Sequence, residues 1–130
     1  MIEVCAAVIR VNNKFLITTR PEGTHLSGQW EFPGGKLESG ESHFDCIIRE
    51  LREELSLNVI PLDKLYTLKW RYREKTVLLH FYRALLLNSE FSKITANDGQ
   101  LIDLVSTNRL RNYNFVEADK SFINYLCFAK

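Results

Sequence analysis

Three glutamates that could do chemistry lie in the segment RELREEL (residues 49–55), at positions Glu50, Glu53 and Glu54. In a helix their i, i+3 and i+4 spacing places the three carboxylates on one face. Like charges at these spacings cost about 0.2–0.5 kcal/mol per pair, and anions in the second half of a helix oppose its dipole. The segment is therefore either a solvated, salt-bridged face or the binding site of a hard cation, Mg²⁺ or Mn²⁺, which would bind phosphates at the same time.

Residues before this segment stand at fixed distances from it. Gly35 is followed after five residues by Glu41, and seven residues later come Arg49 and Glu50. The stretch GKLESGESHFDCIIRELREELSL (residues 35–57) resembles the Nudix box, in which Gly, Glu, Arg-Glu-aliphatic, Glu-Glu and Gly-aliphatic recur at these spacings. Every charged position of the pattern is met, so the resemblance favours the metal-site interpretation of the acids.

One position departs from the Nudix pattern, because Ser56 stands where the family has glycine. That glycine ends the helix, usually with a positive φ. Serine there is expected to cost stability or to alter the helix end, but it removes no catalytic oxygen. A Nudix-fold binding or sensor module without activity is an interpretation from another functional class. Such modules usually lose acids of the box, and this chain keeps them all.

The resemblance implies an enzyme in which water attacks a phosphorus of a nucleoside diphosphate linked to another group, with Mg²⁺ as cofactor and Mn²⁺ as an alternative. Cations stabilise the charge that builds on the phosphate oxygens. Carried over by position, the metal-binding residues would be Gly35, Glu50, Glu53, Glu54 and Asp98. The catalytic residues would be Arg49, Glu50, Glu53 and Asp98. The Gly34 carbonyl is an alternative metal ligand to that of Gly35.

The resemblance also gives these residues separate roles. Arg49 would orient a catalytic carboxylate, and Glu41 would brace the loop and the helix through Arg49, which is a structural role. Glu50 is the first candidate for the general base. Asp98 is the second, because MutT-like members carry an acidic residue there as a metal ligand or base. A plain Asp-Gly turn with Gly99 is the other interpretation of Asp98.

The segment QWEFPGGK (residues 29–36) resembles the MutT-like branch of the family. The residues that this resemblance places at the substrate are Arg20, His25, Phe32, Gly34 and Asp119. His25 is otherwise a surface loop histidine, and Asp119 is otherwise the N-cap of the last helix. An ionised Asp119 only accepts hydrogen bonds, so it would suit a base edge with N–H donors, such as the cytosine amino group or guanine N1 and N2.

The resemblance predicts a nucleoside triphosphate pyrophosphohydrolase that releases a nucleoside monophosphate and pyrophosphate. Oxidised dGTP and CTP or dCTP, modified or not, are the two predicted substrate groups. Tyr72 lies near where dinucleoside polyphosphate hydrolases carry a tyrosine, although the Gly34-Gly35 pair argues against that branch. The aromatic residues that could stack on a base are Trp70, Phe81 and Tyr82, for which a place in the core is the commoner outcome.

The elements that must position these residues can be read from the hydrophobic pattern. Strand-like segments cover residues 3–11, 14–19, 30–32, 57–70, 75–87 and 100–105. Polar loops lie between them at residues 20–29, 36–41 and 88–99, and a helical turn is predicted at 107–112. A hairpin turn is expected at Asn12-Asn13, and a helix from about Asp119.

The helix that carries the acids has its own start signal and apolar stripe. Ser42 followed three residues later by Asp45 resembles a capping box. The predicted apolar stripe consists of Phe44, Ile47, Ile48, Leu51 and Leu55. Interleaved strands and helices predict an α/β (α+β) fold, with a mixed sheet between helices and a single domain over residues 1–130.

Composition limits the other functional classes. The formal charge is +1 and no basic run occurs, so neither a nucleic-acid polymer nor a membrane is an expected partner. The termini carry no targeting signal, and three scattered cysteines (Cys5, Cys46 and Cys127) read as small buried hydrophobes rather than as a disulfide or zinc set. A cytoplasmic protein, monomeric or homodimeric, with a nucleotide as its substrate is the resulting expectation.

Overall fold

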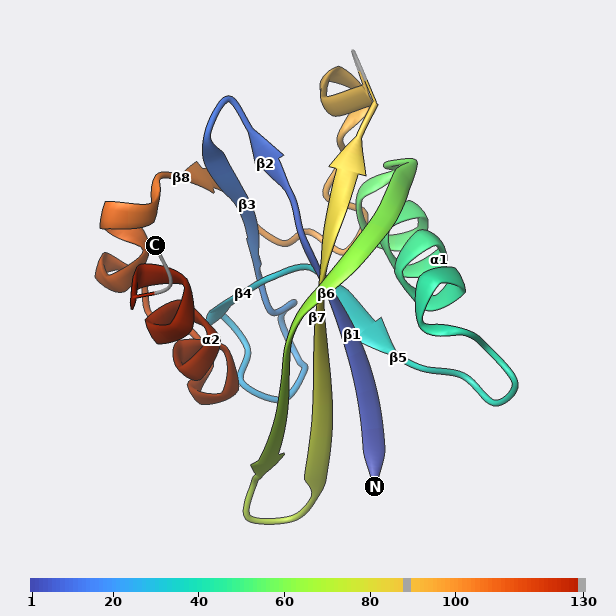
Figure 1. Ribbon diagram of the computed structural model, residues 1–130, viewed down its shortest axis with the longest axis vertical. Helices are drawn as coiled ribbons and strands as arrows, with labels where there is room; N and C mark the ends of the chain where they lie inside the picture. Colours follow the sequence, from blue (N-terminus) through green and yellow to red (C-terminus); the bar gives the residue numbers. More distant parts are fainter. Residues whose placement is uncertain (88–89, 129–130) are drawn as a thin grey trace.

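The computed structural model describes residues 1–87 and 90–128 of the chain (Figure 1). One sheet has the order β5-β1-β7-β6 and contains β1 (Ile2–Val8), β5 (Gly34–Lys36), β6 (Val59–Arg71) and β7 (Thr76–Leu86). This sheet is mixed, because β1 runs parallel to β7 and the other pairs are antiparallel.

The remaining strands form a second, antiparallel sheet, where the sequence predicted a single sheet. It contains β2 (Arg10–Val11), β3 (Lys14–Thr19), β4 (Trp30–Glu31) and β8 (Ile102–Val105), with β3 in the middle. The predicted first strand is divided at Ile9, between β1 in one sheet and β2 in the other. The turn at Asn12 and Asn13, with φ of 51° and 64°, makes the expected hairpin between β2 and β3.

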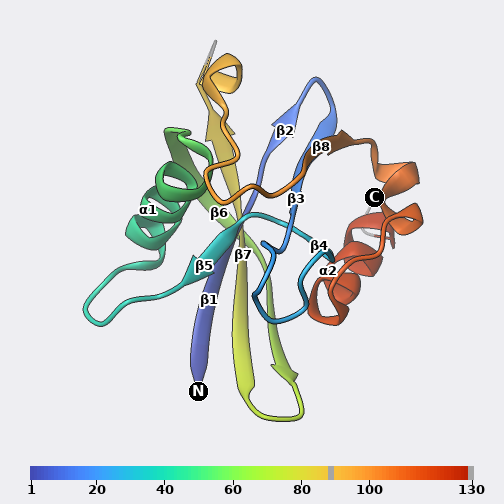
Figure 2. The ribbon, with the colours of Figure 1, turned by 180° about the vertical axis from the view of Figure 1, so that it is seen from behind.

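Two α-helices cover opposite faces of the mixed sheet (Figures 1 and 2). They are α1 (His43–Leu55) and α2 (Glu117–Phe128), and two short 3₁₀ helices, η1 (Glu90–Lys93) and η2 (Thr107–Asn112), complete the described elements. Side chains of alternate residues of β1 point to opposite faces of the mixed sheet. Cys5 and Ala7 pack in the core cluster under α1, whereas Ala6 and Val8 pack in the cluster under α2. The predicted fold class, a mixed sheet between helices, is confirmed.

The start of α1 agrees with its sequence signal, whereas its buried face differs in part. The side chain of Ser42 accepts a hydrogen bond from the Asp45 N–H at 3.0 Å. The buried residues of α1 are Cys46, Ile47, Leu51 and Leu55. Phe44 was predicted in this stripe but is 44% exposed, because it lies in the first turn against the edge of the Tyr82 ring.

The core under α2 is built mainly from aromatic rings. Phe81 stacks on Phe122 with ring centroids 4.2 Å apart, and Phe32 packs on Phe115 at 5.7 Å. Phe81 is fully buried in this core and Trp70 packs against it, whereas Tyr82 is 9% exposed and belongs to the core under α1. The alternative that these three aromatics stack on a base is therefore wrong for Phe81 and Tyr82.

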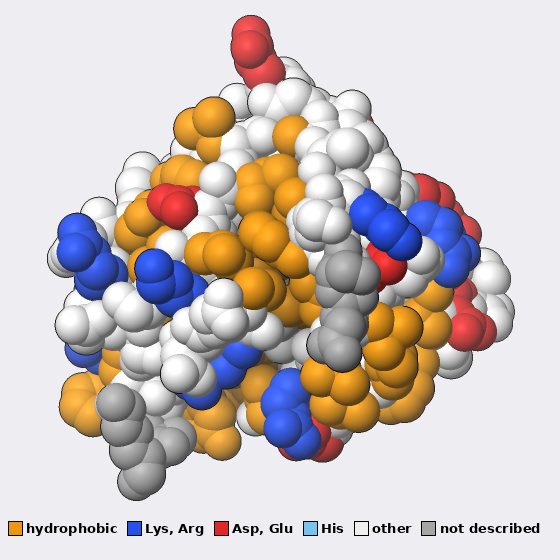
Figure 3. Space-filling model, turned by 90° about the horizontal axis from the view of Figure 1, so that it is seen from above, with side chains coloured by type: hydrophobic (Ala, Val, Ile, Leu, Met, Phe, Trp, Pro, Cys, Tyr) orange, Lys and Arg blue, Asp and Glu red, His pale blue; other side chains and the backbone are white. Residues whose placement is uncertain are grey.

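Seen from above relative to Figure 1, the surface has a central apolar area (Figure 3). Ile60 near the start of β6, Leu85 near the end of β7 and Leu87 just after β7 are large exposed hydrophobic residues. No α-helix within residues 1–87 and 90–128 is long and apolar enough to cross a bilayer. Cys5 and Cys46 are buried free thiols, as predicted, but Cys127 is only partly buried.

Candidate active site

Arg49 on α1 ties the acids of the box to the neighbouring loop. Its Nε and Nη2 lie 2.7 and 2.9 Å from the two carboxylate oxygens of Glu41, which makes a bidentate ion pair. Its Nη1 lies 3.0 Å from Oε2 of Glu50 and 3.3 Å from Oε1 of Glu53. Nη2 also donates to the Lys36 carbonyl at 3.0 Å. The hydrogen bonds from Arg49 are the main reason that the pKa of Glu41 falls to about 2.

Gly35 on β5 leaves space that Glu50 fills. A Cβ atom at Gly35 would overlap the Glu50 carboxylate, so only glycine allows the acid to lie against this stretch of backbone. The strand is held in place because Gly35 pairs with Cys5 of β1, and because Sγ of Cys46 lies 3.5 Å from the Gly35 carbonyl oxygen. A Cβ atom at Gly34 would likewise overlap the Cys5 carbonyl.

The acids of α1 differ in their exposure. The carboxyl groups of Glu50 and Glu54 interact with each other, and burial raises the pKa of both. For Glu54, burial together with the charges of Glu50, Glu31 and Asp98 raises the pKa to about 9. Glu53 is different, since its side chain is 60% exposed. A bound cation would favour the ionised forms, and carboxylate oxygens with a backbone carbonyl are ligands that suit Mg²⁺ or Mn²⁺.

The loop of residues 95–100 covers the C-terminal end of α1. The last carbonyl groups of a helix have no partner inside the helix. Here the Thr95 N–H donates to the Leu55 carbonyl at 3.0 Å, and the Asn97 N–H donates to that of Glu54 at 3.0 Å. The Asn97 side chain donates to the Glu53 carbonyl at 2.7 Å. These bonds fix the loop against the two acids of the last turn.

Ser56 ends α1 in the left-handed conformation, with φ 58° and ψ 32°. The substitution for glycine therefore leaves the helix end in the glycine-type geometry. Its hydroxyl lies 2.8 Å from Oγ1 of Thr95 and accepts from the Asn97 side chain at 3.1 Å. Asp98 follows in the same loop, and its charge acts on Glu54. Serine at this position thus adds contacts to the loop that carries Asp98.

A second group of polar residues lies near the start of α2. Asp119 is 3% exposed, and its Oδ2 accepts a hydrogen bond from the Phe32 N–H at 2.9 Å. Because α2 begins at Glu117, Asp119 lies inside the first turn, so the N-cap interpretation is wrong. Burial and the nearby charge of Glu31 raise the pKa of Asp119 well above 3.8. Only the backbone of Phe32 takes part, since its ring is buried in the core.

Arg20 and Glu31 form the wall next to Asp119. Nη1 of Arg20 lies 3.6 Å from Oε1 of Glu31, and Nε of Arg20 donates to the His25 carbonyl at 3.0 Å. The His25 ring meets the Tyr72 ring edge-on, with centroids 5.1 Å apart. Burial is the main cause that raises the pKa of Glu31 to about 7. The charge of Glu31 acts on both Asp119 and Glu54, so this residue links the two polar groups electrostatically.

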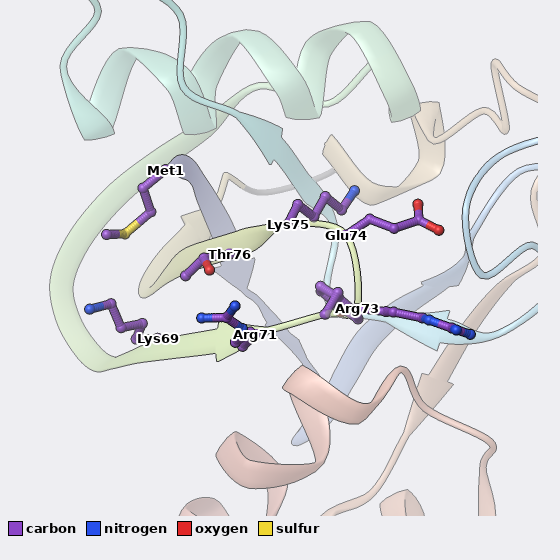
Figure 4. A pocket seen from close by; sticks show the side chains of 8 residues that line it. Met1, Lys69, Arg71, Arg73, Glu74, Lys75 and Thr76 are labelled. Carbon is purple, nitrogen blue, oxygen red and sulfur yellow. The ribbon is translucent and has the colours of Figure 1, made fainter.

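These side chains surround a cavity of about 90 Å³. Its polar and aromatic lining residues are Arg20, His25, Glu31, Tyr72, Lys75 and Asp119. Ligand pockets usually enclose about 300–1,000 Å³, so this cavity holds only part of a nucleotide unless its walls separate. A larger, basic cavity of about 610 Å³ adjoins it and shares Tyr72 and Lys75. Figure 4 shows Lys69 and Arg71 along its strand side, with Arg73 at the β6–β7 turn.

The predicted site residues thus fall into two groups. Those predicted to bind metal, Gly35, Glu50, Glu53, Glu54 and Asp98, lie at or beside the second half of α1. Of the predicted substrate residues, Arg20, His25 and Asp119 line the cavity, whereas Gly34 and the Phe32 ring do not. Sequence reasoning missed Glu31, although alternation in the strand Trp30-Glu31-Phe32 indicates that the glutamate points away from the side of its aromatic neighbours.

Known proteins resemble this chain over part or most of its length. The family model described as NUDIX domain matches residues 1–126. The CTP pyrophosphohydrolase of Escherichia coli (strain K12) is 49% identical over 57 residues, which is 44% of this chain and 42% of that protein. The chain thus aligns with less than half the length of that relative. The 8-oxo-dGTP diphosphatase of Haemophilus influenzae is 30% identical over 129 residues, covering 97% of this chain and 91% of that protein.

Solved structures show the same likeness over the whole described chain. The solution structure of the E. coli ORF135 protein has a TM-score of 0.81 at 28% identity, covering 99% of this chain and 92% of that one. The solution structure of the DNA mismatch repair protein MutT, a Nudix hydrolase from methicillin-resistant Staphylococcus aureus 252, has a TM-score of 0.76 at 32% identity. That match covers 99% of this chain and 97% of the other.

Proposed function

This chain belongs to the Nudix hydrolase family, and we propose that it is a Mg²⁺-dependent nucleoside triphosphate pyrophosphohydrolase of the cytoplasm. One observation carries the proposal. Glu50, Glu53 and Glu54 share the last turns of α1, where Glu50 lies against the Gly35 backbone and Arg49 holds the carboxylates of Glu50 and Glu53. Mg²⁺ bound by these acids would supply positive charge to the phosphate oxygens, and Mn²⁺ has the same ligand preference.

The chain's own residues would divide the work as follows. Glu50 takes a proton from the attacking water, because it lies against the Gly35 backbone and Arg49 fixes its position by a 3.0 Å hydrogen bond. Asp98 is the second candidate for this role, since it is exposed in the loop next to Glu54. Arg49 positions the acids and stays ionised, because its pairing with Glu41 and Glu50 raises the pKa of its guanidinium.

The cavity beside Asp119 would receive the nucleobase. The raised pKa of Asp119 means that its carboxyl is protonated at a higher pH than usual, and a protonated carboxyl donates as well as accepts. This revises the expectation of an acceptor-only contact. Guanine and cytosine edges both combine donors with acceptors, so oxidised dGTP and CTP or dCTP remain the proposed substrates. Their support includes the similarity to the CTP pyrophosphohydrolase of E. coli and the 8-oxo-dGTP diphosphatase of Haemophilus influenzae.

A substrate panel tests the proposal. The pure protein is incubated with Mg²⁺ and 8-oxo-dGTP, dGTP, CTP, dCTP, 5-methyl-dCTP, a diadenosine polyphosphate or ADP-ribose, and released pyrophosphate and phosphate are measured. We expect pyrophosphate from at least one triphosphate and none without a divalent metal. Preference for the diadenosine polyphosphate would favour a second function, that of a dinucleoside polyphosphate hydrolase. Tyr72 on the cavity wall is the observation that supports this function. No turnover of any compound would favour a nucleotide sensor.

A further inference from the structure

A second group of ligand-type side chains lies outside the acid cluster. Glu3 comes from β1, His43 from the first residue of α1 and His80 from β7. Their ligand atoms all lie within 4.8 Å of one another. His43 precedes Glu50 by seven residues, which is about 10 Å along a helix. The two groups are therefore separate, and α1 contributes His43 to one of them and the acids to the other.

The three side chains converge on one point. Nε2 of His80 lies 2.8 Å from Oε1 of Glu3, and Nε2 of His43 lies 3.9 Å from the same oxygen. The two imidazole rings face each other with centroids 4.2 Å apart. His80 is almost fully buried, whereas the side chains of Glu3 and His43 are 40% and 28% exposed. His80 is thus fixed by its burial, and the side chains of Glu3 and His43 can adjust by small rotations.

The surroundings orient both imidazoles. Nδ1 of His43 lies 2.7 Å from the Tyr82 hydroxyl, which leaves Nε2 directed at Glu3. Metal-binding histidines usually donate their other ring N–H to a fixed acceptor in this way. On the other side, Nζ of Lys64 lies 3.0 Å from Nδ1 of His80.

We propose that Glu3, His43 and His80 bind a divalent transition-metal ion of the Zn²⁺ class, independently of the Mg²⁺ site proposed on α1. Two imidazole nitrogens and one carboxylate oxygen are a known zinc ligand set that leaves one position for water, whereas Mg²⁺ prefers oxygen ligands. Zn–N and Zn–O distances near 2.0–2.2 Å require ligand atoms about 3.3 Å apart, which the half-exposed side chains of Glu3 and His43 can reach. The bound ion would join the start of α1 to two strands of the mixed sheet.

Lys64 opposes the binding of a metal ion at this site. Without metal, its ammonium group donates to Nδ1 of His80, so the His80 proton is on Nε2 and points to Glu3. Metal binding at Nε2 moves that proton to Nδ1 or releases it, and a ring with Nδ1–H can no longer accept from Lys64. Because Lys64 is exposed, it can turn away, but its hydrogen bond and its charge oppose the metal.

Zinc titration of the full chain with Mg²⁺ at saturation tests the site. Calorimetry measures affinity, and Co²⁺ absorption reports nitrogen ligation. We expect one Zn²⁺ per chain and binding weakened on the order of 100-fold in His43→Asn. Tyr82→Phe should weaken binding about tenfold, because it removes the acceptor for His43. Lys64→Met should strengthen it about tenfold, because it removes the competing donor and charge.

The control separates this site from the acids of α1. Glu53→Gln should leave Zn²⁺ affinity unchanged under Mg²⁺, and His43→Asn should leave Mg²⁺-dependent hydrolysis unchanged. Glu3→Gln, at a partly exposed position of β1, serves if the histidine variant does not fold, and it should also weaken Zn²⁺ binding. The proposal is overturned if no Zn²⁺ binds under Mg²⁺, or if binding survives His43→Asn and Glu3→Gln but is lost in Glu53→Gln. An unchanged affinity in Lys64→Met would contradict the proton shift at His80.

Discussion

The acid end of α1 and the cavity beside Asp119 are built in opposite ways. The acids come from one short segment, and a single residue, Arg49, contacts Glu41, Glu50 and Glu53. The cavity is assembled from the loop of residues 20–29, the β6–β7 turn and the start of α2. The first region depends on helix periodicity and the second on long-range packing. We therefore expect changes in the first to affect the rate for every substrate, and changes in the second to affect the choice among substrates.

The largest expected effect is at the acid end. Glu53→Gln should lower Mg²⁺-dependent turnover by on the order of 10²-fold or more, because it removes a charged ligand from the site that stabilises the phosphate oxygens. The side chain is exposed, so the fold should be intact. Steady-state rates across the substrate panel and a thermal melt check both points. Asp45→Asn, in the first turn of the same helix, is the matched control. Full activity in Glu53→Gln would remove this residue from the metal site.

A smaller effect, and of another kind, is expected in the cavity. Asp119→Ala should change the ratio of kcat/KM between guanine and cytosine nucleotides by about tenfold. A buried carboxyl that binds a base edge disfavours the wrong base, because that base leaves a buried polar group without a hydrogen-bond partner. The maximum rate on the preferred substrate should change less than this ratio. Glu117→Ala, in the same helical turn but exposed, should leave the ranking unchanged. An unaltered ranking in Asp119→Ala would break the division of roles between the two regions.

The pH dependence of stability sharpens the contrast further. A carboxyl with a raised pKa in the folded state adds stability at low pH and loses it as the pH rises through that pKa. Asp119 is such a group, so Asp119→Asn should gain stability relative to the wild type as the pH rises above about 4. The asparagine oxygen can still accept from the Phe32 N–H. Urea unfolding at pH 5 and pH 8 measures the difference, which should exceed the roughly 0.5 kcal/mol of a neutral surface change at pH 8.

Glu31 adds a pH dependence of the same sign, because its pKa is raised to about 7. The comparison is therefore made between the two proteins at each pH, so that the part of the Glu31 contribution that does not depend on Asp119 is subtracted. A difference that stays constant from pH 5 to pH 8 would show that Asp119 has an ordinary pKa.

The smallest expected effect is at the end of α1. Ser56→Gly relieves a left-handed backbone but loses the hydroxyl contacts, whereas Ser56→Ala loses the contacts and keeps the strain. The alanine variant should be less stable than the glycine variant by about 1 kcal/mol. Chemical unfolding of both variants and the wild type measures this. Equal stability of the two variants would mean that the conformation costs nothing at this position.

The acid end was the more predictable region from sequence. The distances from Gly35 to Glu41 and from Glu41 to Arg49, and the i, i+3, i+4 spacing of the acids, are local properties of a chain that forms a loop and then a helix. The capping of α1 by Ser42 was predicted for the same reason. The exposure of Phe44 was not, since the position of the apolar stripe depends on how α1 sits on the sheet.

The cavity was less predictable, because its residues meet only through tertiary packing. Tyr72 and Lys75 belong to a turn, and nothing in the spacing of a turn indicates which loop it contacts. Phe32 was placed at the substrate, but its ring enters the aromatic core with Phe115 and Phe122 and only its N–H faces Asp119. The division of the strands into two sheets also depends on tertiary packing. No sequence signal at Ile9 shows that the chain leaves one sheet there and enters the other.

The bonds between residues 95–100 and the end of α1 have a consequence for how the molecule opens. The amide protons of Thr95 and Asn97 are bound to helix carbonyls rather than exposed as in an ordinary loop. They should exchange with deuterium only when the last turn of α1 releases them, so helix end and loop would open as one cooperative unit. Local fluctuation of the loop alone would then not separate Asp98 from the acids. A bound ligand that stabilises the end of α1 would therefore also slow the exchange of the Thr95 and Asn97 amide protons, about forty residues further along the chain.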